Sequence, residues 1–430
     1  MPAALVAVLA GLAPGGVIAQ EPSDDGSVRL GITYEPGRAP ALSVAPVGAP
    51  SDLEVAAREV RLILERDLDY SDRFRITPPL LERVSDPPNY ALWNEADVVY
   101  LVAADLTGTA TRPVLRVGLH DVVYGTMTNV QAFSLPSPAS PTFRMAVHRV
   151  SDRIVSWATG GQQGMAATRI AFRRRSSDGR SSLWIVDSDG ENLTRVETGS
   201  ADAVYSPSFS PDGARIAYTS RSVDATYGLH EVNLLTGRRE EIASGQLLLT
   251  PEYTPGGELV WAWGRSGRTS IVTERGAVLS DTGADALNPT FSPDGRQMAY
   301  VSDPAGQPQI YVREVGRAPA RRISVYVRGE RSNAATPDWS PDGRRIAYSA
   351  LVAGQWRIHT VNPDGTDRRQ ITSRGDSEMP SWAPDSRHLV FSVADSRGNS
   401  MWIADTVTGR SRILTSGFID ELADWSTPVR

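Results

Sequence analysis

The sequence predicts an α+β N-terminal domain followed by an all-β six-bladed β-propeller. Three observations lead to this prediction. A short motif recurs through the second half of the chain at intervals of about 40 residues, as in blade repeats. The first half lacks that motif and alternates helical with strand-like periodicity. The chain has 430 residues, which is long enough for two domains with separate cores.

The repeated motif joins an aromatic residue to a Pro-Asp-Gly turn. Its second proline stands at positions 211, 255, 293, 341 and 384, so successive repeats are 44, 38, 48 and 43 residues apart. Proline fixes φ, aspartate can bond its own backbone, and glycine tolerates positive φ. We therefore expect an inner strand that ends at the aromatic residue, then a tight hairpin and an apolar second strand. Four short strands in each repeat are typical of a propeller blade.

The number of blades follows from the two ends of this region. Asp424-Trp425-Ser426 repeats the inner-strand motif a sixth time, and too few residues follow it for a second strand. Residues 168–172 match a second strand but have no inner strand before them. We expect both segments to share one blade, which closes the ring at six blades and removes an open edge.

The first half of the chain predicts a compact α/β layer. Apolar residues at helical spacing mark one helix over residues 53–68, preceded by a capping box from Ser51 to Glu54, and a second helix from residue 141 to residue 157. Residues 97–102 and 114–120 read as strands. Strands mixed with two helices indicate a layer of helices on a sheet.

The segment boundaries follow from composition. Residues 1–19 are mostly apolar and precede a polar stretch, which is typical of a cleavable signal peptide. We expect residues 20–160 to form the N-terminal domain, with a flexible tail at 20–27, and residues 161–430 to form the propeller. No later stretch has the roughly 20 apolar residues that span a bilayer. The prediction is an exported protein without direct membrane insertion.

Two segments of the N-terminal domain carry a family resemblance. The stretch from Asp67 to Phe74 contains Asp-Leu-x-x-Ser-x-x-Phe, and residues 146–152 contain His-x-x-Ser-Asp before a Thr-Arg-Ile-Ala strand. This order resembles the TolB family of the Tol–Pal envelope system. The resemblance implies a non-enzymatic periplasmic scaffold that links a peptidoglycan-associated lipoprotein to a TolA-like inner-membrane protein. It also implies a role in outer-membrane integrity and cell division.

Partner-binding residues are expected on loops that a rigid scaffold presents. The loops that enter the inner strands ring one mouth of the propeller channel, and the resemblance implies that this mouth binds the lipoprotein. Leu247 and Leu248 could instead pack between blades, and both readings stay open. The candidate mouth residues are Tyr205, Leu247, Leu248, Thr250, Leu287, Asn288, Asn333, Thr336, Glu378, Met379, Ile419 and Asp420. The resemblance assigns the TolA-like partner to the tail, at Gln20, Glu21, Pro22, Ser23, Asp24 and Asp25.

The sequence gives little support for an enzyme or for a metal-binding protein. The chain has no cysteine, and its five histidines show no metal-ligand spacing. No Gly-x-Ser-x-Gly motif is present. Residues 187–192 could form a calcium loop, but equivalent turns in other blades lack the ligand set, which favours a hairpin turn. We expect no catalytic residues, no metal and no cofactor.

The remaining predictions concern partners. A net charge of −6, spread along the chain, argues against nucleic acid, which attracts a basic patch. We expect a monomer. The alternative function is a generic secreted propeller that binds or senses peptide or carbohydrate outside the Tol–Pal system.

Overall fold

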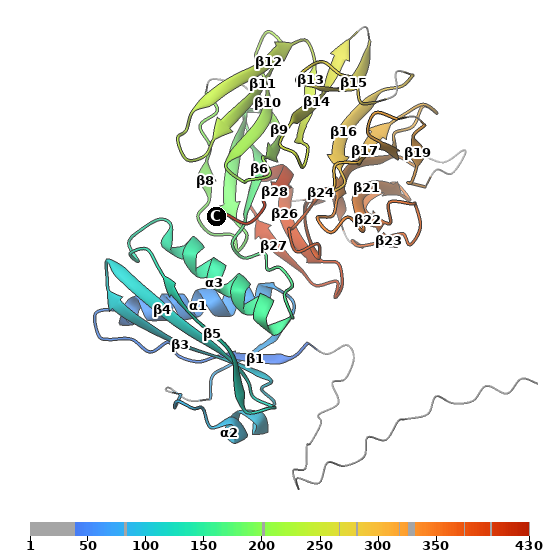
Figure 1. Ribbon diagram of the computed structural model, residues 1–430. Coiled ribbons are helices and arrows are strands. Elements are labelled where there is room, and N and C mark those ends of the chain that lie inside the picture. Colours follow the sequence, from blue (N-terminus) through green and yellow to red (C-terminus); the bar gives the residue numbers. More distant parts are fainter. Residues whose placement is uncertain are drawn as a thin grey trace, which may run out of the picture. The chain divides into compact units, whose positions relative to one another are not determined.

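The computed structural model describes residues 39–80, 84–199, 203–265, 267–280, 283–317, 319–325, 332–373, 375–395 and 398–429. The predicted signal peptide (1–19) and tail (20–27) lie outside these residues. Within them, one five-stranded sheet with helices precedes six propeller sheets (Figure 1).

The five-stranded sheet has the order β2-β1-β3-β4-β5. β1 runs parallel to β2 and β3, while β3, β4 and β5 are antiparallel. Helices α1 and α3 lie side by side on one face, where they share an apolar core with β1, β3 and β4 (Figure 1). The elements are β1 (Ala41–Val44), α1 (Glu54–Tyr70), β2 (Arg75–Thr77), α2 (Tyr90–Glu95), β3 (Tyr100–Thr109), β4 (Arg112–Asp121), β5 (Thr126–Ser134) and α3 (Phe143–Ala158).

The start of α1 differs from the prediction. Its N-cap is Leu53, and no side chain caps the helix. The Leu53 N–H instead donates to the Pro50 carbonyl at 2.9 Å, so the preceding residues form a separate turn. The capping box predicted at Ser51 is therefore wrong, because the helix begins too late for that hydroxyl to reach its first free N–H groups.

Six sheets form the propeller, and five of them have four strands. The blade at β13 has three strands among the described residues. In chain order the strands are β6 (Arg169–Arg175), β7 (Ser181–Asp187) and β8 (Thr194–Arg195); β9 (Ala203–Phe209), β10 (Arg215–Arg221), β11 (Tyr227–Asn233) and β12 (Arg239–Gly245); β13 (Leu248–Tyr253), β14 (Leu259–Arg265) and β15 (Arg268–Thr273); β16 (Ala286–Phe291), β17 (Gln297–Ser302), β18 (Gln309–Glu314) and β19 (Arg321–Arg322); β20 (Ala334–Trp339), β21 (Ile346–Val352), β22 (Gln355–Val361) and β23 (Arg369–Gln370); β24 (Asp376–Trp382), β25 (His388–Asp395), β26 (Gly398–Asp405) and β27 (Ser411–Thr415); and β28 (Ile419–Trp425).

The motif geometry is confirmed in every blade, because all six inner strands end at the predicted aromatic residue. The turn after β9 shows why. Gly213 has φ 68°, and the Ser210 hydroxyl donates to Asp212 at 2.5 Å and accepts from the Arg215 N–H at 3.0 Å. Such a turn holds the first two strands of a blade in register.

The ring closes as the sequence predicts. β28 pairs antiparallel with β6, with Trp425 opposite Ile170, and Figure 1 shows the red β28 beside the green β6. Arg174 on β6 donates to both oxygens of Asp420 on β28, at 2.7 and 2.8 Å. Asp420 is fully buried, so closure depends on a buried ion pair as well as on strand pairing.

Candidate functional site

The inner strands share an unusual backbone feature at the channel. At the same position in all six blades, a residue other than glycine has φ between 44° and 59°. A break in strand register occurs there in each blade, as in a β-bulge. Residues other than glycine rarely adopt a backbone conformation with positive φ, and those that do cluster at functional sites. They are Ser206, Thr250, Asn288, Thr336, Met379 and Leu422.

These six residues line a narrow cavity of about 90 Å³ on the channel axis. Two positions further along each strand stands a second ring, in which hydroxyl and carboxyl side chains alternate around the channel. We call this set the acid–hydroxyl ring, and it consists of Ser208, Glu252, Thr290, Asp338, Ser381 and Asp424.

Hydrogen bonds of the acid–hydroxyl ring join several neighbouring blades. Asp338 accepts the Trp382 N–H at 2.6 Å, and Asp424 accepts the Phe209 N–H at 2.6 Å. The Thr290 hydroxyl donates to Asp338 at 3.3 Å. Bulged strands leave backbone N–H groups without ladder partners, and the ring satisfies them.

Burial dominates the electrostatics of the ring. Burial raises the pKa of Asp338 to about 6 and that of Asp424 to about 7, against the hydrogen bonds that each carboxylate accepts. Burial also raises the pKa of Glu252, and Asp424 and Asp338 raise it further. The raised pKa values bring the titration of Asp338 and Asp424 close to neutral pH, and burial disfavours the charged form of all three carboxyl groups.

The structure places four of the predicted mouth residues on the channel cavity, namely Thr250, Asn288, Thr336 and Met379. The Tyr205 ring lies under the Arg173 guanidinium, 4.8 Å from the ring centroid. Five more do not line that cavity but are partly exposed: Leu247, Leu287, Asn333, Glu378 and Ile419.

Two predicted mouth residues do not reach the surface. Leu248 is 1% exposed and packs between blades with Leu229 and Trp261. Asp420 is fully buried in its pair with Arg174. Their placement on a partner surface is wrong, because the interior of the blade contacts these side chains. Leu247 packs against Gly264 but keeps part of its surface.

The sequence reasoning missed the acid–hydroxyl ring. Its signal was present, because each ring residue precedes the aromatic residue of its repeat. Read in order, those positions alternate between a hydroxyl and an acid, as in Pro-Ser-Phe, Pro-Glu-Tyr and Pro-Thr-Phe. Such alternation across repeats is visible once the repeats are aligned.

The comparisons with known proteins agree with this architecture. Residues 158–427 match the model of the TolB beta propeller domain. The chain belongs to the TolB β-propeller family. Tol-Pal system protein TolB from Polaromonas sp. is 31% identical over 193 residues, which cover 44% of this chain and 43% of the relative. The TolB of Albidiferax ferrireducens is 30% identical over 191 residues, with 44% and 43% covered.

These alignments span less than half of the length of the curated relatives. A crystal structure of TolB from Acinetobacter baumannii covers more of the chain. It shares 24% identity and a TM-score of 0.79, over 90% of this chain and 97% of that chain. At this identity the likeness shows the fold, so the predicted fold class is confirmed. Within the described residues, no helix is both long and apolar enough to cross a membrane.

Two buried histidines mark where this TolB-family chain joins α1 and α3 to the blades. His148 on α3 has Nδ1 2.8 Å from Asp67 of α1 and Nε2 3.8 Å from Asp189 of the propeller. Burial opposes protonation, but Asp67 and Asp189 raise the pKa of His148 overall. The Arg144 guanidinium also contacts Asp189.

The second cluster centres on His388, whose Nδ1 lies 2.7 Å from Asp385 and Nε2 3.2 Å from Asp72 at the end of α1. Each cluster gathers a histidine and two carboxylates whose possible ligand atoms lie within 4.8 Å of one another. The carboxylates are Asp67 and Asp189 beside His148, and Asp72 and Asp405 beside His388. However, Arg387 pairs with Asp405 at 2.6 Å and Arg410 with Asp72 at 2.8 Å. Because guanidinium groups already neutralise these oxygens, the geometry favours ion-pair networks over metal centres.

Neither these clusters nor the turn at residues 187–192 forms a catalytic arrangement. The Ser151 hydroxyl donates to Asp67 at 2.5 Å rather than to His148, so the serine, histidine and aspartate do not form a relay. In the turn, Asp187 accepts from the Asn192 amide at 2.7 Å, and Asp189 pairs with arginine. Protein donors thus occupy the oxygens that a calcium ion would need.

Proposed function

We propose that this chain is a non-enzymatic scaffold of the Tol–Pal system, which binds a peptidoglycan-associated lipoprotein at the propeller mouth. Membership of the TolB family and relatives named Tol-Pal system protein TolB support this proposal. The repeated bulge at the mouth is the structural observation that carries it. It aims six non-glycine side chains at one cavity at the expense of backbone strain.

The proposal includes export to the periplasm after removal of residues 1–19. The acidic tail, residues 20–27, binds a TolA-like inner-membrane protein. A polar segment that orders on binding gives modest and reversible affinity. Together the two contacts link the inner membrane to the peptidoglycan layer, and so support outer-membrane integrity and cell division.

The test is calorimetric titration of residues 20–430 with the purified peptidoglycan-binding lipoprotein of the same organism. Asn288→Arg and Met379→Arg should weaken binding about tenfold or more, because both side chains line the channel cavity. Leu235→Arg is the matched control, since Leu235 is 92% exposed in a turn between β11 and β12. Equal affinity for all variants, or no binding at all, would contradict the mouth assignment.

Deletion of residues 20–27 tests the tail separately. The shortened chain should fold and bind the lipoprotein but lose the TolA-like protein. Retained binding of the TolA-like protein would show that the tail assignment is wrong.

A further inference from the structure

Strand β5 differs from every other sheet edge that the structure describes. It forms one edge of the five-stranded sheet, and its sequence Thr-Met-Thr-Asn-Val-Gln-Ala-Phe-Ser contains neither a charged residue nor a proline. No described strand pairs with its outer side. The opposite edge, β2, has only three residues and includes Arg75.

The propeller protects its edges consistently. Each outer edge strand carries an arginine, and each inner edge strand carries a proline or acidic residues. Charges, prolines and short length are the usual means by which proteins prevent an edge from pairing with another chain. A nine-residue edge without any of them is therefore competent to accept a further strand.

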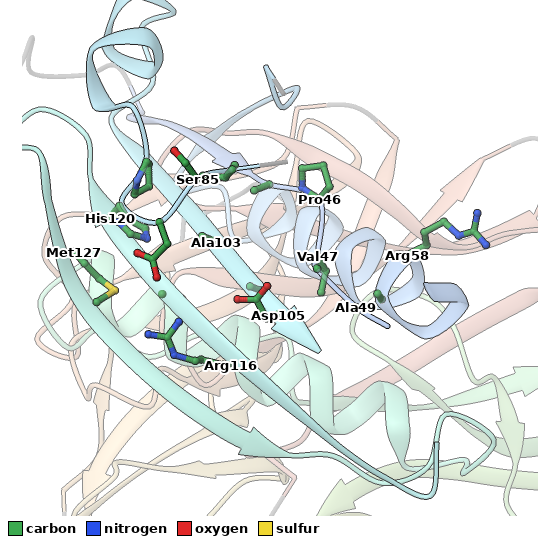
Figure 2. Close-up of a pocket in the computed structure, with 18 of the residues that line it drawn as sticks. Pro46, Val47, Ala49, Arg58, Ser85, Ala103, Asp105, Arg116, His120 and Met127 are labelled. Atoms are coloured by element: carbon green, nitrogen blue, oxygen red, sulfur yellow. The ribbon is translucent and has the colours of Figure 1, made fainter. Parts of the chain in front are cut away.

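The side chains on and beside β5 indicate which residues an added strand would carry. On the face opposite the helices, Val130 pairs with Gly118 and Ala132 pairs with Arg116 across β4 and β5. Val130 is 46% exposed and Met127 is 45% exposed. Met127, Arg116 and His120 line the same cleft, of about 540 Å³, as Figure 2 shows.

Arg116 provides a charge for recognition. It makes no hydrogen bond or ion pair with any described residue, although it stands directly opposite Asp105 on β3. Its cross-strand neighbour on β5 is the small Ala132, so the guanidinium can extend over β5. An added strand would lie about 10 Å from β4, two inter-strand spacings, which an arginine and a glutamate side chain bridge together.

We propose that β5 accepts an extended peptide segment of a partner protein as a sixth strand, with an acidic side chain paired to Arg116 and an apolar side chain two residues away against Val130. A second copy of this chain fits less well. β5 has no acidic residue, so a self-paired edge would leave Arg116 unpaired. The proposal concerns the α/β domain and stands whether or not the propeller mouth binds a lipoprotein.

The test uses a dye-labelled peptide, acetyl-Thr-Val-Thr-Glu-Thr-Val-Thr-amide, titrated with residues 20–430 at low salt and followed by anisotropy. Because the peptide is palindromic, it places valine two residues from glutamate in either strand direction. We expect saturable binding that slows amide exchange in β5. The same peptide N-methylated at alternate amides should not bind, because it cannot complete the ladder.

Two variants of the chain locate the site. Val130→Lys should weaken binding about tenfold, because it places a charge on the edge, whereas Leu235→Lys on the propeller should leave binding unchanged. Arg116→Glu should weaken binding about fivefold, and a peptide with lysine in place of glutamate should restore it.

Three outcomes would overturn the proposal. The first is absence of saturable binding to the unmethylated peptide. The second is equal affinity of the native chain and Val130→Lys, with both folded by near-ultraviolet circular dichroism. The third is protection of β5 amides that rises with protein concentration in the absence of peptide, which would make a second copy the occupant.

Discussion

The propeller and the five-stranded sheet differ in whether their terminal strands are paired. The propeller joins β28 to β6 and fixes that pairing with Arg174 and Asp420, a pair in which the carboxylate is fully buried. The five-stranded sheet ends at β5, which is neutral and solvent-exposed along most of its length. In the propeller, a pair of opposite charges helps to complete a sheet. In the five-stranded sheet, the absence of charge from the edge strand leaves that edge able to pair with a further strand.

Breaking the closing ion pair should have the largest effect on stability. Asp420→Ala leaves Arg174 buried without its carboxylate, which we expect to lower the free energy of unfolding by about 3–5 kcal/mol. Denaturant unfolding measures this change. Asp178→Ala is the control, because Asp178 and its partner Arg180 are largely exposed, and solvent screens such surface pairs so that they contribute little to stability. Similar losses in both variants would refute a special role for closure.

The acid–hydroxyl ring makes propeller stability depend on pH. The pKa of Asp424 rises from about 4 unfolded to about 7 folded, so its protonated form favours the fold. This contribution is complete below the unfolded pKa and is lost as the pH rises through about 7. Asp424→Asn still accepts the Phe209 N–H, and it should reduce the fall in unfolding free energy between pH 5 and pH 8 by about 2–4 kcal/mol. An unchanged pH profile would count against the ring.

The fold favours the charged form of His388, whereas it favours the neutral form of Asp424. In both cases the contribution to stability should fall as the pH rises. Burial opposes its protonation, yet Asp385 and Asp72 hold the pKa of His388 above its ordinary value overall, with Arg387 and Arg410 on the surrounding carboxylates. The contribution of the imidazolium is present below about pH 6.5 and is lost as the pH rises through the folded pKa. His388→Gln should cost about 1–3 kcal/mol at pH 6 and less at pH 9 in thermal unfolding. A larger cost at pH 9 would reverse this assignment.

A charge on the open edge should have the smallest effect. Val130→Lys places an ammonium group in solvent, so the unfolding free energy should change by less than about 0.5 kcal/mol. A loss above 1 kcal/mol by denaturant unfolding would mean that the β5 edge is part of the folded core rather than a free surface.

Local signals in the sequence predicted most of the propeller. The aromatic residue and the Pro-Asp-Gly turn act within a few residues of each other, so all six inner strands end where the motif places them. The burial of Leu248 could not be read in the same way, because a bulge shifts the register between Leu249 and Glu252. The partner of Asp420 lies 246 residues away, and no local pattern reveals it.

The five-stranded sheet was harder to predict from sequence. Its central strands were predicted because Val102, Val117 and their neighbours form apolar runs. β5 was missed because its residues are exposed on both faces and mix hydroxyl, amide and apolar side chains without clear alternation. The features that make β5 a docking edge are thus the same features that hide it from a pattern search.

The pairing of β28 with β6 also constrains how the protein is made. A ribosome or an export channel releases the chain from its N-terminus, so β6 emerges long before β28. Until β28 arrives, the inner edge of β6 has no partner, and the ring stays open across some 250 residues of intervening chain. Long-range pairing of this kind forms slowly. Chaperone protection should therefore matter most in the interval between synthesis of the first and the last strand of the closing blade.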